Sequence, residues 1–126
     1  MQHFGALIGR VLLVHIFLLA GLDKIQGYTG TTDYMQDHGV PIWFLPAVIA
    51  LELAAGVAVI VGWRTRIAAG ALAGFCVAAA ILFHHDFATE PNMVMFMKNV
   101  AMAGGLLLLV VHGAGRWSVD HWLARL

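Results

Sequence analysis

Long apolar stretches alternate with short polar or glycine-containing segments along this chain. A transmembrane helix needs ~20 mostly apolar residues, because the hydrocarbon core is about 30 Å thick and each residue adds about 1.5 Å. Four stretches meet this requirement. They predict membrane spans over residues 4–22, 43–61, 67–83 and 94–111. We therefore expect an all-α, polytopic membrane protein built as a four-transmembrane-helix bundle.

The composition agrees with a chain that is surrounded mostly by lipid. Apolar residues make up 61% of the 126 residues and charged residues only 11%, against roughly 25% charged residues in soluble domains. A soluble protein of this size would need many more polar side chains to cover its surface. The length suits one domain, so we expect residues 1–126 to form a single transmembrane domain. The net charge is zero and there is no basic stripe, which argues against nucleic acid as a partner.

Charged residues near the span ends predict the orientation. With an even number of spans, both termini and the turn between the second and third spans lie on one side of the membrane. That side carries Arg64, Arg66, Arg116 and Arg125, and the other side carries Lys24. The positive-inside rule then places both termini in the cytoplasm of a bacterial inner membrane. The long first loop and the third loop would face outward.

The last residues of the chain predict a short helix at the membrane surface. It begins at Ser118 or Asp120. Trp117, Trp122 and Arg125 would then lie in the headgroup region, where aromatic and basic side chains are favoured. We expect this C-terminal helix to be interfacial rather than membrane-spanning.

Glu52 is the most informative polar residue, because it lies near the middle of the second span. A charge at mid-bilayer costs at least ~2.5–3.5 kcal/mol, so this carboxyl must be protonated, paired, or exposed to an internal water cavity. The functional interpretation is a proton carrier, which makes Glu52 the candidate catalytic residue, or a hydrogen-bonding group for a ligand. The structural alternative is a buried ion pair that determines how the helices pack. Both interpretations stay open.

The partner of Glu52 depends on which face of the first span points inward. Arg10 and Lys24 share one helical stripe, and we expect that stripe to face the bundle. His15 lies on a different face and is expected to be a neutral, packed histidine. Lys98 is the expected ionic partner of Glu52, with outward snorkelling as its alternative. The candidate ligand-binding residues are Arg10, Lys24, Glu52, Lys98 and Asn99.

Other candidate features receive simpler interpretations. Cys76 is the single cysteine, so an intramolecular disulfide is excluded, and its mid-span depth predicts inert packing. Gly70 and Gly74 form a GxxxG pattern that predicts packing within the bundle, with homodimerisation as the alternative. Histidines and carboxylates of the outer loops show no spacing diagnostic of a metal site, and none is predicted. A haem is not expected, because His15 has no histidine at matching depth.

Several short segments over nearly the whole chain carry a family pattern. They are Gly9–Leu13 with Phe17, Ala20–Lys24, Glu52 with Gly56 and Gly62, Phe96–Asn99 with Gly104 and Gly105, the loop from Gly27 to Pro41, and the ending from Gly113 to Asp120. In this order they resemble the DoxX-like membrane proteins, and the loop and the ending resemble the YqjF-type branch. The resemblance implies a four-helix membrane bundle and places the candidate ligand-binding residues on the family's polar positions. It also implies a link to redox chemistry, since some relatives are tied to thiosulfate:quinone oxidoreduction and others to redox stress.

Three functions remain open. The first is a redox-linked membrane subunit, associated with quinone or thiol chemistry, in which Glu52 relays protons to a quinone held between the helices. The chain shows no electron carrier of its own, so a protein partner in a redox complex would supply electrons, and any enzymatic activity would be that of an oxidoreductase subunit. The second is a non-enzymatic scaffold or anchor for a partner protein. The third is a small transporter, which would need a homo-oligomer because four short helices make a thin wall.

Overall fold

The computed structural model describes residues 1–86, 88 and 90–126, and its regular elements are helices. In chain order they are α1 (Gln2–Gln26), α2 (Tyr28–Asp37), the 3-10 turn η1 (Ile42–Phe44), α3 (Leu45–Val61), α4 (Thr65–Phe83), α5 (Glu90–His112) and α6 (Val119–Ala124). Four segments are long and apolar enough to cross a membrane: α1, η1 with α3, α4, and α5. The all-α fold with four membrane-spanning helices is therefore confirmed.

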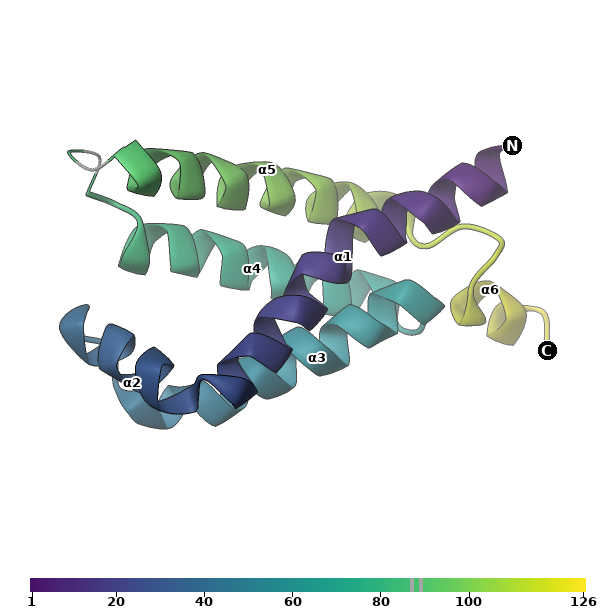
Figure 1. The fold of residues 1–126 in the computed structure, drawn as a ribbon. Helices are drawn as coiled ribbons and strands as arrows, with labels where there is room; N and C mark the ends of the chain where they lie inside the picture. Colours follow the sequence, from purple (N-terminus) through teal and green to yellow (C-terminus); the bar gives the residue numbers. More distant parts are fainter. Residues whose placement is uncertain (87, 89) are drawn as a thin grey trace.

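The helices pack so that both chain termini lie at the same end of the bundle (Figure 1). Helix α5 runs back along α4, and α1 crosses the face of α3. The small helix α6 lies at the end that holds the termini, whereas α2 lies at the opposite end. This arrangement follows from an even number of spans, as the apolar pattern predicted.

Helices α1 and α3 approach each other closely at Gly56. A Cβ atom added there would lie 2.9 Å from Cδ2 of Leu18, which is too close for a carbon–carbon contact. In lipid there is little hydrophobic gain when helices associate, so close packing at small residues supplies much of the attraction. Gly56 therefore lets α1 and α3 pack closely.

The two glycines of the GxxxG pattern in α4 are not both packed against another helix. Gly70 makes only an ordinary contact, since an added Cβ would lie 3.7 Å from Cγ2 of Val110. Gly74 is exposed, and nothing lies within 4 Å of the position of its missing Cβ. The prediction that both glycines pack within the bundle is thus wrong for Gly74.

The segment expected as a long first loop forms a second helix, α2. The prediction of a loop rested on the glycine and threonine residues between 27 and 32. Those residues have low helix propensity, but tertiary packing overrides propensity in a helix this short. The helix places one of its faces against the rest of the bundle, and Met35 on that face is buried.

The C-terminal segment docks on the end of the bundle through backbone hydrogen bonds. Asp120 accepts from the backbone N–H of Arg64 at 2.7 Å and of Thr65 at 2.9 Å, so it caps the first turn of α4. Its own backbone N–H donates to the Gly62 carbonyl at 2.7 Å. Ser118 is the N-cap of α6 and accepts from the backbone N–H of His121. The predicted C-terminal helix is present, with Ser118 as its N-cap and Val119 as its first residue.

Asp120→Asn is expected to lower the free energy of unfolding by about 1 kcal/mol at neutral pH, because asparagine keeps only one of the two acceptor oxygens that bind the N–H groups of Arg64 and Thr65. Partial burial favours the neutral acid, but hydrogen bonds from Thr65 and Arg64 and the charge of Arg10 outweigh it. The pKa of the Asp120 carboxyl therefore lies below its usual value. Unfolding in detergent micelles, measured with each variant at several pH values, checks this expectation.

The sign of the pH dependence follows from the lowered pKa of Asp120. The contribution is fully present above the unfolded-state pKa of about 4, and it is lost as pH falls through the lower folded-state value. The stability difference between the original protein and Asp120→Asn should therefore be constant above about pH 4 and shrink below it. Equal stability of the two proteins at pH 7 would contradict the capping role.

Candidate functional site

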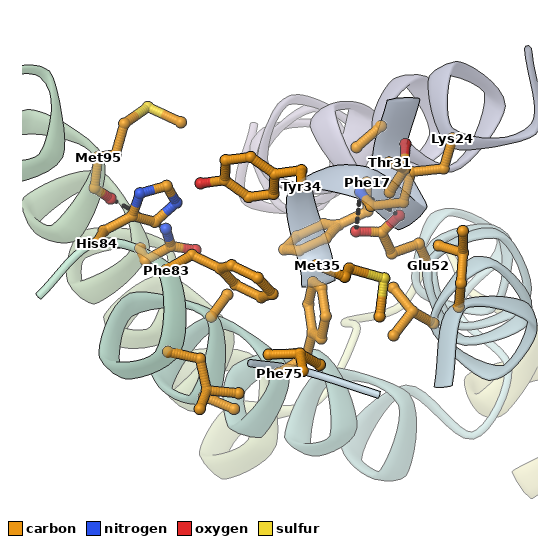
Figure 2. A pocket seen from close by; sticks show the side chains of 18 of the residues that line it. Phe17, Lys24, Thr31, Tyr34, Met35, Glu52, Phe75, Phe83, His84 and Met95 are labelled. Atoms are coloured by element: carbon orange, nitrogen blue, oxygen red, sulfur yellow. Dashed lines mark hydrogen bonds and ion pairs between the residues drawn. The ribbon is translucent and has the colours of Figure 1, made fainter. Parts of the chain in front are cut away.

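A cavity of about 560 Å³ lies at the end of the bundle that carries α2, and residues of α1, α2, α3, α4 and α5 line it (Figure 2). Its volume falls within the ~300–1,000 Å³ typical of small-molecule sites. Most of the wall is apolar or aromatic, with Phe17, Phe75 and Met102 among its residues. The polar side chains on the wall are those of Lys24, Thr31, Tyr34, Glu52, His84, Lys98 and Asn99.

Glu52 and Lys24 form an ion pair on this wall. The Lys24 ammonium nitrogen Nζ lies 3.1 Å from each of the two carboxylate oxygens of Glu52. The Glu52 side chain is 2% exposed and the Lys24 side chain 25% exposed. A carboxylate buried this deeply is stable only with a partner, and one ammonium group shared by both oxygens provides it.

The pairing corrects the prediction that Lys98 is the partner of Glu52. Helix α1 continues to Gln26, beyond the predicted end of the first span, so Lys24 is still part of the helix. The buried residues of α1 include Arg10 and Phe17, which confirms the predicted inward stripe. Lys24 follows on the same stripe and therefore points toward α3.

Helix α5 contributes Lys98 and Asn99 to the same cavity wall. Asn99 is 9% exposed, and its Nδ2 donates to the backbone carbonyl of Met95 at 3.0 Å. Lys98 is exposed, and it has no carboxylate within salt-bridge distance in the described parts of the chain. Its three N–H donors are thus available to an acceptor in the cavity.

Arg10 lies away from this cavity. Its Nη1 donates to the Ala114 carbonyl at 3.2 Å and its Nη2 to the Trp117 carbonyl at 2.7 Å. These contacts hold the segment after α5 at the end of the bundle where the termini lie. The structure therefore brings together Lys24, Glu52, Lys98 and Asn99, and it separates Arg10 from them.

The aromatic residues of α2 were not among the predicted site residues. The Tyr34 ring stacks on that of Phe83, with centroids 5.3 Å apart (Figure 2). The centroid of the Tyr34 ring also lies 4.3 Å from that of the His38 ring. Burial raises the pKa of the Tyr34 phenol, so it remains a neutral hydroxyl at physiological pH. Thr31, Tyr34 and Met35 all line the cavity and follow helical spacing. This spacing was a weak sequence signal for α2, because the glycine and threonine residues beside it favour a loop.

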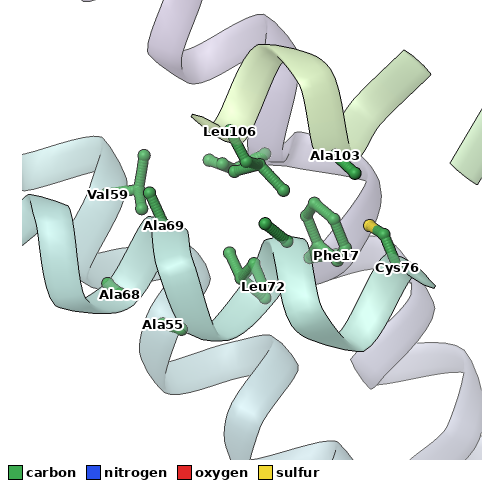
Figure 3. Close-up of a cluster of buried hydrophobic side chains, with 11 residues drawn as sticks. Phe17, Ala55, Val59, Ala68, Ala69, Leu72, Cys76, Ala103 and Leu106 are labelled. Atoms are coloured by element: carbon green, nitrogen blue, oxygen red, sulfur yellow. The ribbon is translucent and has the colours of Figure 1, made fainter. Parts of the chain in front are cut away.

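His15 and Cys76 lie outside the site. His15 is exposed and its Nδ1 donates to the backbone carbonyl of Leu12, so the prediction of a packed histidine is wrong. Cys76 is fully buried in the apolar core with Phe17, Leu72 and Leu106 (Figure 3). The core thus surrounds the thiol with apolar side chains, as expected for a packing cysteine.

Comparison with known proteins identifies the family. A family model described as DoxX matches residues 5–85, which is more than half of the chain. The chain belongs to the DoxX family. The resemblance that the sequence segments suggested is thereby confirmed.

Proteins similar in sequence to this DoxX protein are named as inner membrane proteins or as an oxidoreductase. The inner membrane protein YqjF of Escherichia coli (strain K12) is 45% identical over 123 residues, covering 98% of this chain and 95% of its own. The inner membrane protein YphA of the same strain is 37% identical over 121 residues, covering 90% and 86%. The "Putative oxidoreductase CatD" of Bacillus subtilis (strain 168) is 34% identical over 108 residues, covering 86% and 75%. No solved structure gives a significant match.

The DoxX match includes only part of the candidate site. It ends at residue 85 and so covers α1 to α4, including both members of the Lys24–Glu52 pair. Lys98 and Asn99 lie beyond it, within the longer match to YqjF. With four apolar spans and inner-membrane relatives, this DoxX chain is a multi-pass inner-membrane protein.

Proposed function

We propose that this protein is the membrane subunit of a redox system and that its cavity holds a quinone-type ligand. The observation that carries the proposal is the apolar cavity of about 560 Å³ with the Lys24–Glu52 ion pair on its wall. A quinone is an apolar ring with carbonyl acceptors, so it suits a wall that is largely aromatic and carries a few donors. The name of the Bacillus relative, which assigns that protein to the oxidoreductases, supports the same class of chemistry.

The donors are arranged for a ligand that accepts hydrogen bonds. The Lys98 ammonium group and the second N–H of the Asn99 amide are available to a carbonyl oxygen. The rings of Phe17 and Phe75 provide apolar surface for the quinone ring. Lys24 adds a third donor, the second that is cationic, and is itself held in place by Glu52.

Glu52 is proposed as the proton carrier. Reduction of a quinone to its quinol takes up two electrons and two protons, one on each carbonyl oxygen. A partner oxidoreductase would supply the electrons. Glu52 would take protons from water and pass them toward the ring, with Lys24 stabilising the carboxylate after each transfer.

The proposed orientation places this cavity on the outer side of the membrane. Arg64 lies between α3 and α4 and Arg66 in the first turn of α4, at the end that carries the termini, and the positive-inside rule assigns that end to the cytoplasm. The Lys24–Glu52 pair and the cavity lie toward the other end. A soluble partner that supplies electrons to this site would then act from the outer side.

Ala79→Phe is expected to reduce co-purified quinone to background, because Ala79 lines the cavity and a phenyl ring would fill part of it. Protein is purified in mild detergent, extracted with organic solvent, and assayed for quinone per chain by mass spectrometry. Ala71→Phe is the matched control, since Ala71 lies on the same helix, is exposed and does not line the cavity. Glu52→Gln, which removes the carboxylate but keeps the volume, should also lower the quinone content.

The same assay can overturn the proposal. Quinone no higher in the original protein than in the lipid background would remove its basis, and equal quinone in Ala79→Phe and Ala71→Phe would place the ligand elsewhere. The first result would favour the scaffold interpretation, in which the Lys24–Glu52 pair is structural.

A further inference from the structure

We propose a second ligand site on the face of α3 that points away from the bundle. This site binds one acyl chain and the phosphate of an anionic phospholipid. A groove runs along this face and is separate from the cavity described above. Its walls include Ala50, Leu53, Ala54, Val57 and Trp63. Small side chains on an exposed helix face leave a hollow that a flexible, apolar chain can fill.

The length of the groove matches one leaflet of the membrane. Its residues extend along α3 from Ala50 to Val61, and eleven steps of about 1.5 Å give about 16 Å. Half of a hydrocarbon core of about 30 Å is nearly the same length. A lipid acyl chain in this groove would therefore run from the headgroup region to the middle of the bilayer.

A cation lies at the headgroup end of the groove. The guanidinium carbon of Arg64 lies 5.4 Å from the centre of the Trp63 ring, and Trp63 is part of the groove wall. An arginine stacked on an indole ring still presents its N–H edge, which can bind a phosphate through two parallel hydrogen bonds. Within the described residues, Arg64 has no carboxylate at salt-bridge distance from its guanidinium group.

The backbone of Arg64 supports a role for its side chain. Arg64 has φ of 46°, in the left-handed region that disfavours every residue with a Cβ atom and favours glycine. Asp120 holds this conformation by accepting the Arg64 backbone N–H. An arginine at a position that glycine would satisfy better indicates that its side chain contributes something other than stability.

The charge of the headgroup selects the lipid. Arg66 and Arg116 lie at the same end of the bundle, so the local charge is positive. A zwitterionic headgroup carries its own cation beside the phosphate, whereas phosphatidylglycerol does not. Phosphatidylglycerol should therefore bind more tightly than phosphatidylcholine with the same acyl chains.

Native mass spectrometry of the purified full-length protein, titrated with each of these two lipids, tests the proposal. Arg64→Gly is expected to weaken phosphatidylglycerol binding about tenfold, the usual effect of losing a charged hydrogen bond. It should weaken phosphatidylcholine binding less, because the choline cation already offsets the charge of that phosphate. It should leave thermal stability unchanged or slightly improved, because glycine suits the backbone of that position. Arg66→Gln is the matched control for charge, and it should weaken phosphatidylglycerol binding less than Arg64→Gly, because Arg66 does not line the groove or stack on Trp63.

A variant whose side chain fills the groove tests the proposal independently of Arg64. Ala54 is exposed and lines the groove, so Ala54→Phe should weaken binding of both lipids without disturbing the bundle, and Ala71→Phe should not. Equal binding of the two lipids by the original protein would overturn the proposal. So would an Arg66→Gln variant that loses as much phosphatidylglycerol as Arg64→Gly.

Discussion

Lys24→Met is expected to lower the free energy of unfolding by about 3 kcal/mol, whereas Lys98→Met should change it little. Removing one partner of a buried ion pair leaves an uncompensated charge, which typically costs ~3–5 kcal/mol. The Glu52 side chain is 2% exposed, so it cannot recover solvation from water. We place the effect at the lower end of that range because the carboxyl group can take up a proton once its partner is lost.

Unfolding in mixed micelles with increasing denaturing detergent measures this difference. The double variant Lys24→Met with Glu52→Gln should recover most of the lost stability, because a neutral amide needs no ionic partner. Lys98→Met serves as the control, since Lys98 carries the same charge on the same cavity wall but is not paired with Glu52. If Lys98→Met destabilised the protein as much as Lys24→Met, the assignment of the pair would be wrong.

Gly62→Ala should destabilise the protein by about 3 kcal/mol and release the C-terminal segment. Gly62 has φ of 76°, a left-handed conformation that costs a residue with Cβ ~1–2 kcal/mol. An added Cβ would also lie 2.3 Å from the Ser118 Cβ and 2.6 Å from the Arg10 Nη1 atom. Overpacking of this kind adds ~1–3 kcal/mol. The clash falls on two residues that hold the segment after α5, so that segment should be displaced.

Limited proteolysis of the C-terminal segment, together with micelle unfolding, checks the effect of Gly62→Ala. Faster cleavage near residues 114–120 is expected, together with lower stability. Gly74→Ala is the matched control, because Gly74 is helical and exposed and has open space at its Cβ position. That variant should be neutral or more stable by up to about 1 kcal/mol. If protease cleaved the C-terminal segment no faster in Gly62→Ala than in the original protein, this would contradict the docking of that segment on the end of the bundle.

Much of the candidate site could be predicted before the structure. Lipid makes an unpaired mid-span charge costly, and this alone made Glu52 the residue to examine. Helical spacing along the first span predicted that Arg10 and Lys24 lie on its inward stripe. The cost of a polar side chain within a span also made Lys98 and Asn99 candidate residues, and both line the cavity.

The partners of these residues could not be predicted. Helical spacing shows which side of a helix a side chain lies on, but it does not show which residue of a neighbouring helix lies at the same depth in the membrane. Lys24 pairs with Glu52 because α1 extends to Gln26 and crosses α3 at a particular height. Arg10 lies on the same stripe, yet it donates to the backbone carbonyl groups of Ala114 and Trp117, which are 104 and 107 residues further along the chain. Both outcomes depend on how the helices are shifted along one another.

The sequence by itself determined that lipid surrounds most of the chain and that the chain has four spans. These depend on sums over many residues, such as the apolar length that matches a bilayer, and single errors in boundaries do not change them. Only the tertiary structure decided that α2 is a helix, that its aromatic face lines the cavity, and that Asp120 caps α4. Each of these depends on contacts between distant segments, whose free energy is absent from local patterns and appears only when the helices pack.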